Sequence, residues 1–445
     1  MHTCCTRTPP DDAAQHMMRL LRANRELRLL FIAQVISFMG DWFSFVAVTG
    51  MVKDATGSEF LVSVAFVSFS LPAFLVSPIA GVAVDRFDRR KLLLTVSVFQ
   101  MFAALGLRTA SSTSVWPLFV FQGIISAFGS FVKPAIDAGV PNLARNPEEL
   151  RVANALFGST WGVMLAVGAA LGGVFSQAFG RPAAFAANAI SFLIAMGLFA
   201  MIRRPMQEPA HANRPAMRPL ADISEAVSYA RKDHAVLALI ASKSTFAIGA
   251  GTVSQLPVLA TSAFGWGDGG TGMLLAARGL GAGLGPLIAS RFAKGSVAKV
   301  LQICGLAGIG FSASYLAAGW APAIWVAAIF IALGHLGGGA QWTLSTYGLQ
   351  MRTPDHIRGR VMAGDFAIVT LIMSVAGLAA GLLSEAVGVR WTITVFASAA
   401  GLAGLAYIAL TRPIMLQLRA EESTARTASV TGTASVTGTT ESQPS

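Results

Sequence analysis

Long apolar stretches alternate with short polar segments along most of this chain. A helix needs roughly 20 apolar residues to cross the hydrocarbon core of a bilayer, which is about 30 Å thick. Twelve stretches meet this requirement, namely residues 29–52, 60–84, 92–110, 115–138, 152–177, 183–202, 236–262, 269–291, 298–318, 321–348, 361–386 and 391–411. The pattern therefore predicts an all-α membrane protein with twelve transmembrane helices.

The longest polar interruption divides the predicted helices into two groups of six. It follows the sixth apolar stretch, contains four prolines and is typical of a linker. The chain ends in a Ser/Thr/Gly repeat that is too polar to fold. We therefore expect an N-terminal tail at 1–28, a six-helix bundle at 29–202, a linker at 203–235, a second six-helix bundle at 236–411 and a disordered tail at 412–445.

Two internal matches indicate that the halves are related. The segment RNPEELR at 145–151 resembles RTPDHIR at 352–358, at an offset of 207 residues, and Pro78 and Pro286 are separated by 208. Matches at nearly one offset favour a duplication, in which parallel repeats form a substrate site at the midplane between them.

Both copies of this segment also have the pattern of a helix start. Asn146 or Thr353 is expected as the N-cap, followed by proline at the first helical position and an acid in the first turn. An ordinary helix start would have the same pattern without any duplication. That alternative explains each segment by itself, but it does not explain why the two matches share nearly one offset.

Composition and charge agree with a membrane protein. The chain is 54% hydrophobic and only 12% charged, with a mean hydropathy of +0.62. The net charge of +11 does not indicate nucleic-acid binding, because the basic residues fall in short clusters between apolar runs. Cys4, Cys5 and Cys304 have no disulfide or metal-ligand spacing, and we expect no metal or cofactor.

The distribution of Lys and Arg predicts the orientation. If the N-terminus is cytoplasmic, the cytoplasmic segments carry 26 of these residues and the opposite segments carry 4. By the positive-inside rule, both termini and the linker are then expected in the cytoplasm.

A charged motif lies between the second and third apolar stretches. Gly81, Asp85, Arg86, Arg89 and Arg90 have the spacing GxxxDRxxRR. This resembles the loop 2-3 signature of the major facilitator superfamily, and the likeness extends over essentially the whole ordered chain. The resemblance implies two pseudo-symmetric six-helix bundles that work by alternating access, with helices one, four, seven and ten around the cavity and with Asp85 as a latch that docks at the start of span eleven.

Three further segments narrow the resemblance. Residues 34–42, 153–156 and 358–361 are similar to those of the enterobactin-exporter-like and macrolide-efflux-like group of bacterial exporters. This implies proton-driven export across the bacterial inner membrane, by a protein that works as a monomer. The chain departs from antiporter patterns at Ala169, where their signature has proline, and in span four at 119–123, which lacks an arginine.

Asp41 is the clearest candidate for proton coupling. A charge at the bilayer centre costs at least about 2.5 kcal/mol, so an acid there is a functional hypothesis. Gln34, Ser37, Asp41 and Ser44 follow helical spacing and share one face, which is expected to line a polar cavity. The alternative is that Asp41 is a satisfied packing residue.

Span four has a similar polar face. Gln122, Ser126, Ser130, Lys133 and Asp137 are spaced by three or four residues. Lys133 and Asp137 are i,i+4 partners, so they are expected either to neutralise each other structurally or to take part in substrate binding and coupling.

The second half offers four more candidates. His335 is a possible titrating group, and Trp342 and Thr346 share its helix face. Lys243 is expected to snorkel to the cytoplasmic end of its helix.

Arg278 has no evident partner in its own helix. It is expected either to attract an anionic substrate group or to pair with Asp41 or Asp137. Asp365 is expected to join the cytoplasmic charge network.

Small residues predict close packing between helices. Gly168 and Gly172, and likewise Gly281 and Gly285, have the small-xxx-small spacing and are expected at packing or hinge positions.

The function favoured by these features is proton-driven export of an amphiphilic small molecule, drug-like or siderophore-like. The alternatives are a metabolite uptake carrier of the same fold and a non-coupled uniporter or sensor. An enzyme is not expected, because the chain contains no HExxH, GxSxG, P-loop or CxxC motif.

Overall fold

The computed structural model describes residues 10–207, 228–293 and 296–436, and this part of the chain is built from helices. Twelve of its helices are long and apolar enough to span a membrane, which confirms the predicted number. They are α2 (Arg25–Thr56), α3 (Glu59–Arg86), α4 (Arg89–Gly106), α5 (Trp116–Leu143), α6 (Pro147–Phe179), α7 (Arg181–Ala200), α9 (His234–Ser254), α11 (Asp268–Ala293), α12 (Val297–Gly319), α13 (Ile324–Arg352), α14 (Asp355–Val387) and α15 (Val389–Val436).

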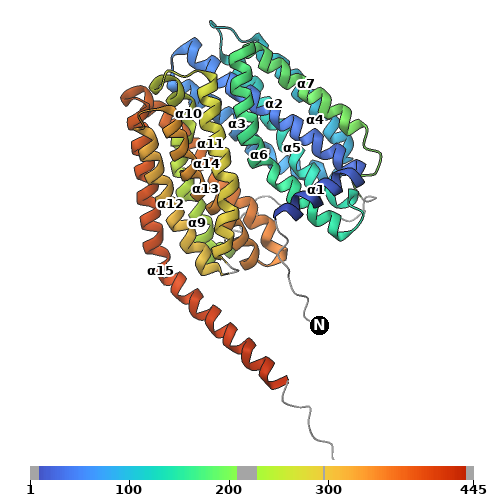
Figure 1. Ribbon diagram of the computed structural model, residues 1–445, viewed down its shortest axis with the longest axis vertical. Coiled ribbons are helices and arrows are strands. Elements are labelled where there is room, and N and C mark those ends of the chain that lie inside the picture. Colours follow the sequence, from blue (N-terminus) through green and yellow to red (C-terminus); the bar gives the residue numbers. More distant parts are fainter. Residues whose placement is uncertain (1–9, 208–227, 294–295, 437–445) are drawn as a thin grey trace, which may run out of the picture.

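The spanning helices form two groups that lie side by side (Figure 1). We call α2–α7 the N half and α9–α15 the C half. The side of the bundle where α7 ends and α9 begins is called the linker side, and α1 (Pro10–Ala23) also lies there. The opposite side, where α10 (Leu256–Val258) and the π-helical turn η2 (Leu259–Ala263) lie, is called the far side.

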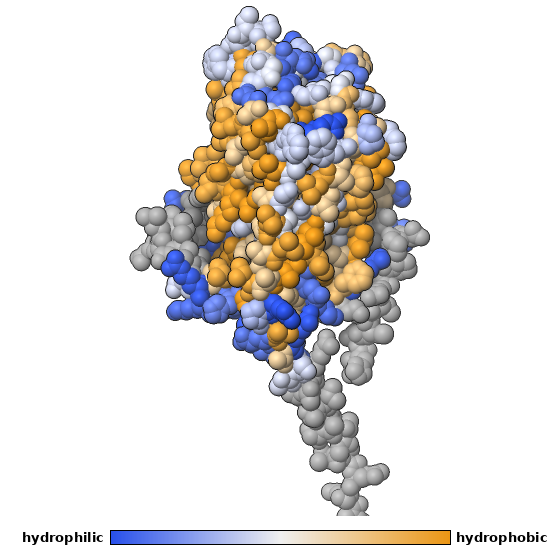
Figure 2. Space-filling model, turned by 90° about the vertical axis from the view of Figure 1, so that its left-hand side faces the viewer, coloured by the Kyte–Doolittle hydropathy of each residue, from blue (hydrophilic) through white to orange (hydrophobic). Residues whose placement is uncertain are grey.

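The surface has the distribution that a bilayer requires. Figure 2 shows a broad hydrophobic band around the bundle, with hydrophilic residues gathered at its two ends. Large apolar side chains such as Leu287 and Val174, each 64% exposed, lie on the outside of the helices. The apolar band is therefore explained by contact with lipid acyl chains.

Polar side chains define where several helices begin. The side chains of Asn24, Ser58, Asp88, Asn146, Asp233 and Ser296 each accept a hydrogen bond from a backbone N–H in the first turn of the next helix. The prediction for Asn146 is thus confirmed. The prediction for Thr353 is wrong, because α14 begins one residue later, after Pro354, and the Thr353 hydroxyl is buried without a hydrogen-bond partner among the described residues.

Helices α6 and α14 support the internal duplication. Both contain 33 residues, and each ends at a glycine with φ +82°, Gly180 after α6 and Gly388 after α14. With ψ near 155–159°, this backbone region is accessible essentially to glycine alone. The two glycines are separated by 208 residues, close to the offset of 207 between the helix starts.

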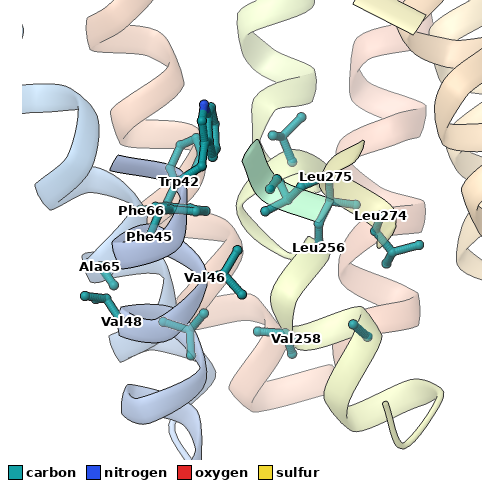
Figure 3. Packing of buried hydrophobic residues seen from close by; sticks show 14 of the residues in the cluster. Trp42, Phe45, Val46, Val48, Ala65, Phe66, Leu256, Val258, Leu274 and Leu275 are labelled. Carbon is teal, nitrogen blue, oxygen red and sulfur yellow. The ribbon is translucent and has the colours of Figure 1, made fainter. Parts of the chain in front are cut away.

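The buried apolar side chains form three clusters. The largest joins both halves on the far side, and in Figure 3 residues of α2 and α3 such as Val46 and Phe66 lie opposite Leu256 of α10 and Leu275 of α11. The other two lie on the linker side, one built from the N half together with α1 and the segment after α7, and one from the C half and the residues just before it. The halves therefore share a core on the far side and have separate cores on the linker side.

Both terminal segments contain more helix than the sequence pattern indicated. Residues of the expected N-terminal tail form α1, whose Leu20 is buried. The expectation of a disordered tail from residue 412 also differs from the structure, because α15 continues through Pro413 to Val436. Its first turns beyond the proline are held against the start of α12. Glu422 accepts a 2.6 Å hydrogen bond from Ser296, and Arg419 donates a 2.8 Å hydrogen bond to Gln302.

Candidate functional site

An arginine joins the two halves on the far side. Arg181, at the start of α7, donates from Nε and Nη2 to both carboxylate oxygens of Asp268 in α11, at 2.9 and 3.0 Å. The same guanidinium lies 2.7 Å from Asp54 at the end of α2. Gly50 leaves room for this contact, because a Cβ at that position would collide with both Arg181 and Asp268. The bidentate, mostly buried pair is a strong polar connection between the halves.

Helices α3 and α14 form a second polar connection on the same side. Glu59 accepts hydrogen bonds from Ser384 and, at 3.3 Å, from Ser262. Conversely, Glu385 of α14 accepts hydrogen bonds from the hydroxyl of Ser58 and from the backbone N–H of Phe60, at the start of α3. Deeper in the bundle, Gln255 donates to Ser63 at 2.8 Å. Sequence reasoning missed these pairs because their partners are far apart along the chain.

Glycines bring α6 of the N half against α11 of the C half. A Cβ on Gly173 would lie 3.0 Å from Gly272 Cα, and one on Gly162 would lie 3.6 Å from Gly283 Cα. Gly279 likewise packs against the backbone of Ala166. The two halves therefore approach at backbone distance, which even the Cβ of an alanine at Gly173 or Gly279 would prevent.

A buried ion pair joins three helices of the C half. Lys243 of α9 is paired with Asp365 of α14, and both residues are nearly inaccessible. The Lys243 ammonium also donates to Thr346 of α13 at 2.8 Å and lies 5.3 Å from the centroid of the Trp342 ring. The expectation that Lys243 snorkels to the helix end is therefore wrong, because a carboxylate inside the bundle satisfies its charge.

A second polar cluster lies nearer the middle of the C half. The ring nitrogen Nε2 of His335 is 2.8 Å from the Tyr315 hydroxyl. Arg278 of α11 is close enough to both residues to interact with them electrostatically. Arg278 is 9% exposed, and its Nε is buried without a hydrogen-bond partner. Among the described residues, no ion pair joins Arg278 to Asp41 or Asp137, the two partners that the sequence suggested.

The polar stripe of α2 packs against α7. Asn188 of α7 donates to Ser44 at 2.8 Å and also interacts with Asp41. A Cβ on Gly40 would collide with Asn188 and Ser191. Asp41 is partly buried, and its Oδ1 has no hydrogen-bond partner in the described structure. The other two members of the stripe, Gln34 and Ser37, are buried.

The polar stripe of α5 extends from a buried to an accessible environment. Gln122 is buried, with neither amide atom hydrogen-bonded in the described structure, and Ser126 donates to the Phe69 carbonyl of α3. Lys133 and Asp137 form an i,i+4 ion pair of 2.6 Å, and their side chains are 57% and 51% exposed. The pair lies on the linker-side portion of α5.

The arginines of the loop 2-3 motif hydrogen-bond to carbonyl groups near the ends of other N-half helices. Arg89 donates to Ala138 and Met206 at 2.7 and 2.8 Å, and Arg90 donates to Phe199 and Ala200.

The other members of the motif differ in their surroundings. Arg86 is exposed. The structure leaves open space around Gly81, since a Cβ there would meet no other atom within 4 Å. The side chain of Asp85, the expected latch, lies outside the described residues.

The four glycines predicted at packing positions lie at helix contacts. Gly168 and Gly172 of α6 face Trp42 and Phe43 of α2, and Gly281 and Gly285 of α11 lie against the backbone of α13. Within the described part of the chain, no group of three His, Cys, Asp or Glu side chains is placed to hold a metal ion.

Comparison with known proteins identifies the architecture. A family model of the major facilitator superfamily, described as a transmembrane secretion effector, matches residues 21–434. The chain belongs to this family. The resemblance seen in the loop 2-3 motif is thereby confirmed, and the protein is a multi-pass membrane transporter rather than an enzyme.

Curated relatives of this transporter include efflux proteins. It is 25% identical over 406 residues to the multidrug efflux pump Tap of Mycobacterium bovis, covering 86% of this chain and 92% of that protein. It is 26% identical over 218 residues to the uncharacterized MFS-type transporter YfiS of Bacillus subtilis, and 27% identical over 188 residues to the putative bacilysin exporter BacE of Bacillus amyloliquefaciens. The chain spans about half the length of these two Bacillus relatives, 51% and 46%.

Solved structures support the same fold. The transporter matches a bacterial homolog of the human lysosomal transporter Spinster, in an inward-facing and unoccupied conformation, with a TM-score of 0.68 and 16% identity over 93% of this chain and 99% of that chain. It also matches a peptide transporter POT in complex with alafosfalin, with a TM-score of 0.71 and 13% identity over 89% of this chain and 96% of that chain. At these identities the likeness concerns the fold alone.

Proposed function

We propose that the protein exports an amphiphilic small molecule, drug-like or siderophore-like, across the bacterial inner membrane in exchange for protons, by alternating access and as a monomer. The observation that carries the proposal is the arrangement of the cores, shared on the far side and separate on the linker side. This arrangement is expected of a carrier whose halves are in contact on one side of the membrane and can separate on the other. Comparison with the efflux relatives supports the outward direction.

The charge distribution supports an assignment of the two sides. In the described structure, basic residues of α1, of the loop 2-3 motif and of the segment after α7 lie on the linker side, and the positive-inside rule assigns such a side to the cytoplasm. The far side then faces outward, and the polar connections of Arg181 and Glu385 form its closed gate.

Asp41 is the residue that we propose to exchange protons. Asp137 and Asp365, which also lie well inside their helices, are each held by a lysine. Asp41 interacts instead with the neutral Asn188, and its Oδ1 has no partner among the described groups. A carboxyl group without a cation can gain and lose a proton without breaking an ion pair, so Asp41 fits the coupling role better than the other two acids or His335.

The first test uses inverted membrane vesicles with a pre-formed proton gradient. Panels of siderophores, macrolides and lipophilic cations are added while the internal pH is recorded. We expect at least one class to discharge the gradient with the wild-type protein and not with Asp41→Asn. This variant keeps the size of the side chain and removes its ability to exchange a proton.

Asp137→Asn is the matched control, because it removes an exposed carboxylate from another helix. It is expected to retain a larger share of the proton response than Asp41→Asn. Substrate accumulation with no pH response would contradict proton coupling and favour a uniporter. Equal responses from the wild type and Asp41→Asn would remove Asp41 from the mechanism.

A further inference from the structure

Arg278 lies next to the contact between the two halves. Its neighbour Gly279 packs against Ala166 of α6 in the N half, and Gly281, three residues after Arg278, packs against α13. The outward face of the same helix is marked by Leu280, which is 57% exposed. Leu280 is two residues beyond Arg278, which is about 200° around the helix, so Arg278 is turned away from that apolar outer face. Its guanidinium therefore lies inside the protein.

Arg278 also differs from the other buried cations of the spans in its partners. Arg181 is bonded to two carboxylates, and Lys243 is paired with Asp365. Among the described residues no carboxylate forms an ion pair with Arg278, and its buried Nε has no acceptor. A buried charge is normally paired, because an unpaired one pays its desolvation cost without compensation. Arg278 thus has a capacity to bind an anion that the protein itself does not use.

The surroundings of Arg278 suit the organic part of an amphiphile. Tyr315 and His335 are close enough to it to interact electrostatically, and they are hydrogen-bonded to each other. Phe246 packs against this pair, with its ring centroid 5.9 Å from that of His335 and 6.5 Å from that of Trp342. Of these rings Trp342 is only partly buried, and an aromatic ring of this kind can supply apolar contact area to an aromatic or aliphatic body.

We propose that Arg278 is an anion-binding group of the substrate site, so that the transported molecule is an amphiphilic organic anion with a carboxylate or phosphate group. The guanidinium binds such groups with two parallel hydrogen bonds, and the aromatic residues of α9 and α13 contact the apolar body. That this anion is transported rests on the proposed export function. Binding itself is open to test without transport.

The experiment measures binding to the full-length protein in lipid nanodiscs by isothermal titration calorimetry. The ligands are three amphiphilic carboxylic acids, including 1-naphthylacetic acid, each compared with its own methyl ester. We expect the wild type to bind at least one acid ten-fold or more tightly than its ester. In Arg278→Gln this ratio is expected to fall close to one, whereas Arg278→Lys keeps the charge and retains part of the preference.

Arg291→Gln is the matched control, because it removes an exposed arginine from the same helix and is expected to leave the ratio unchanged. The melting temperature without ligand provides a second readout. Removing an unpaired buried charge is expected to leave it unchanged or raise it, whereas removing a structural ion pair would lower it. An acid-to-ester ratio near one for all three pairs in the wild type, or an unchanged ratio in Arg278→Gln, overturns the proposal.

The outcomes separate this site from the export function. Anion-selective binding that depends on Arg278, combined with no transport in vesicles, supports the site and contradicts export. Transport of amphiphiles at the same rate by the wild type and Arg278→Gln, with equal binding of acids and esters, supports export and contradicts the site.

Discussion

Lys243 and Asp365 form a buried ion pair, in which each charge is neutralised by a residue of another helix. Each residue is buried in the C half, and the pair is supported by Thr346 and Trp342 of a third helix. Because the partners are 122 positions apart, the sequence shows two isolated charges and gives no sign that they meet. The same holds for Arg278, whose lack of an acid depends on every helix packed around it. Helix periodicity located these residues, but their partners depend on tertiary packing.

The pair predicts a non-additive effect of mutation. Lys243→Met leaves Asp365 charged and unpaired, and Asp365→Asn does the same to Lys243, so each single change is expected to cost about 3–5 kcal/mol of stability. The double variant removes both charges and is expected to be more stable than either single variant. The stability of the three variants is measured by thermal unfolding in detergent, with the remaining fraction of monodisperse protein as the readout. Additive losses would show that the two charges do not stabilise each other.

At the scale of elements, hydrophobic length predicted the spanning helices well. Several boundaries depend instead on local backbone chemistry. The N-cap at Asn146 followed from its side chain, whereas Pro354 moved the start of α14 by one residue. The extension of α15 beyond Pro413 could not be read from composition, because contacts of Glu422 and Arg419 with the C half hold its first polar turns.

Gly388 allows a test of the break between α14 and α15. Open space surrounds it, so Gly388→Ala introduces no clash and its effect comes from the backbone at φ +82°. We expect a loss of about 1–3 kcal/mol, the typical cost of a strained conformation. Gly310→Ala is the matched control, because Gly310 is also surrounded by open space but lies inside α12. There alanine is expected to stabilise the helix by roughly 0.5–1 kcal/mol. Equal effects at both positions would exclude backbone strain as the cause.

At the scale of the whole molecule, the far side holds the halves together through a few polar groups and a shared core. The bidentate contact between Arg181 and Asp268 connects α7 to α11 across the interface. The two-bundle fold could be predicted from twelve apolar runs and one loop motif. The side on which the bundles meet could not, because it depends on contacts between residues far apart along the chain, such as Arg181 and Asp268.

Asp268→Asn is expected to open the far side more often. The change removes a charge-assisted contact worth about 1.5–3 kcal/mol, which corresponds to a shift of roughly ten-fold or more in the balance between closed and open states. A cysteine placed at the buried Ser63 reports the opening by its rate of labelling with a membrane-impermeant maleimide, in a background where Cys4, Cys5 and Cys304 are replaced by serine.

The control for this variant is Asp54→Asn, which affects the same arginine through a partner that is 63% exposed. It is expected to increase labelling less than Asp268→Asn, because an exposed ion pair contributes little. Labelling at the same rate in all three proteins would show that the contact with Asp268 does not hold the gate.

The ion pair of Lys243 and Asp365 also has a consequence for biosynthesis. Lys243 enters the membrane with α9, before the ribosome has made α14, which carries its partner 122 positions further along the chain. During this interval a lone ammonium group lies in or near hydrocarbon, at a cost of about 2.5–3.5 kcal/mol on insertion scales. The newly made helix is then more stable beside the translocation machinery or at the lipid surface than deep in the bilayer. The C half is therefore expected to settle into its final position only after α14 has been synthesised.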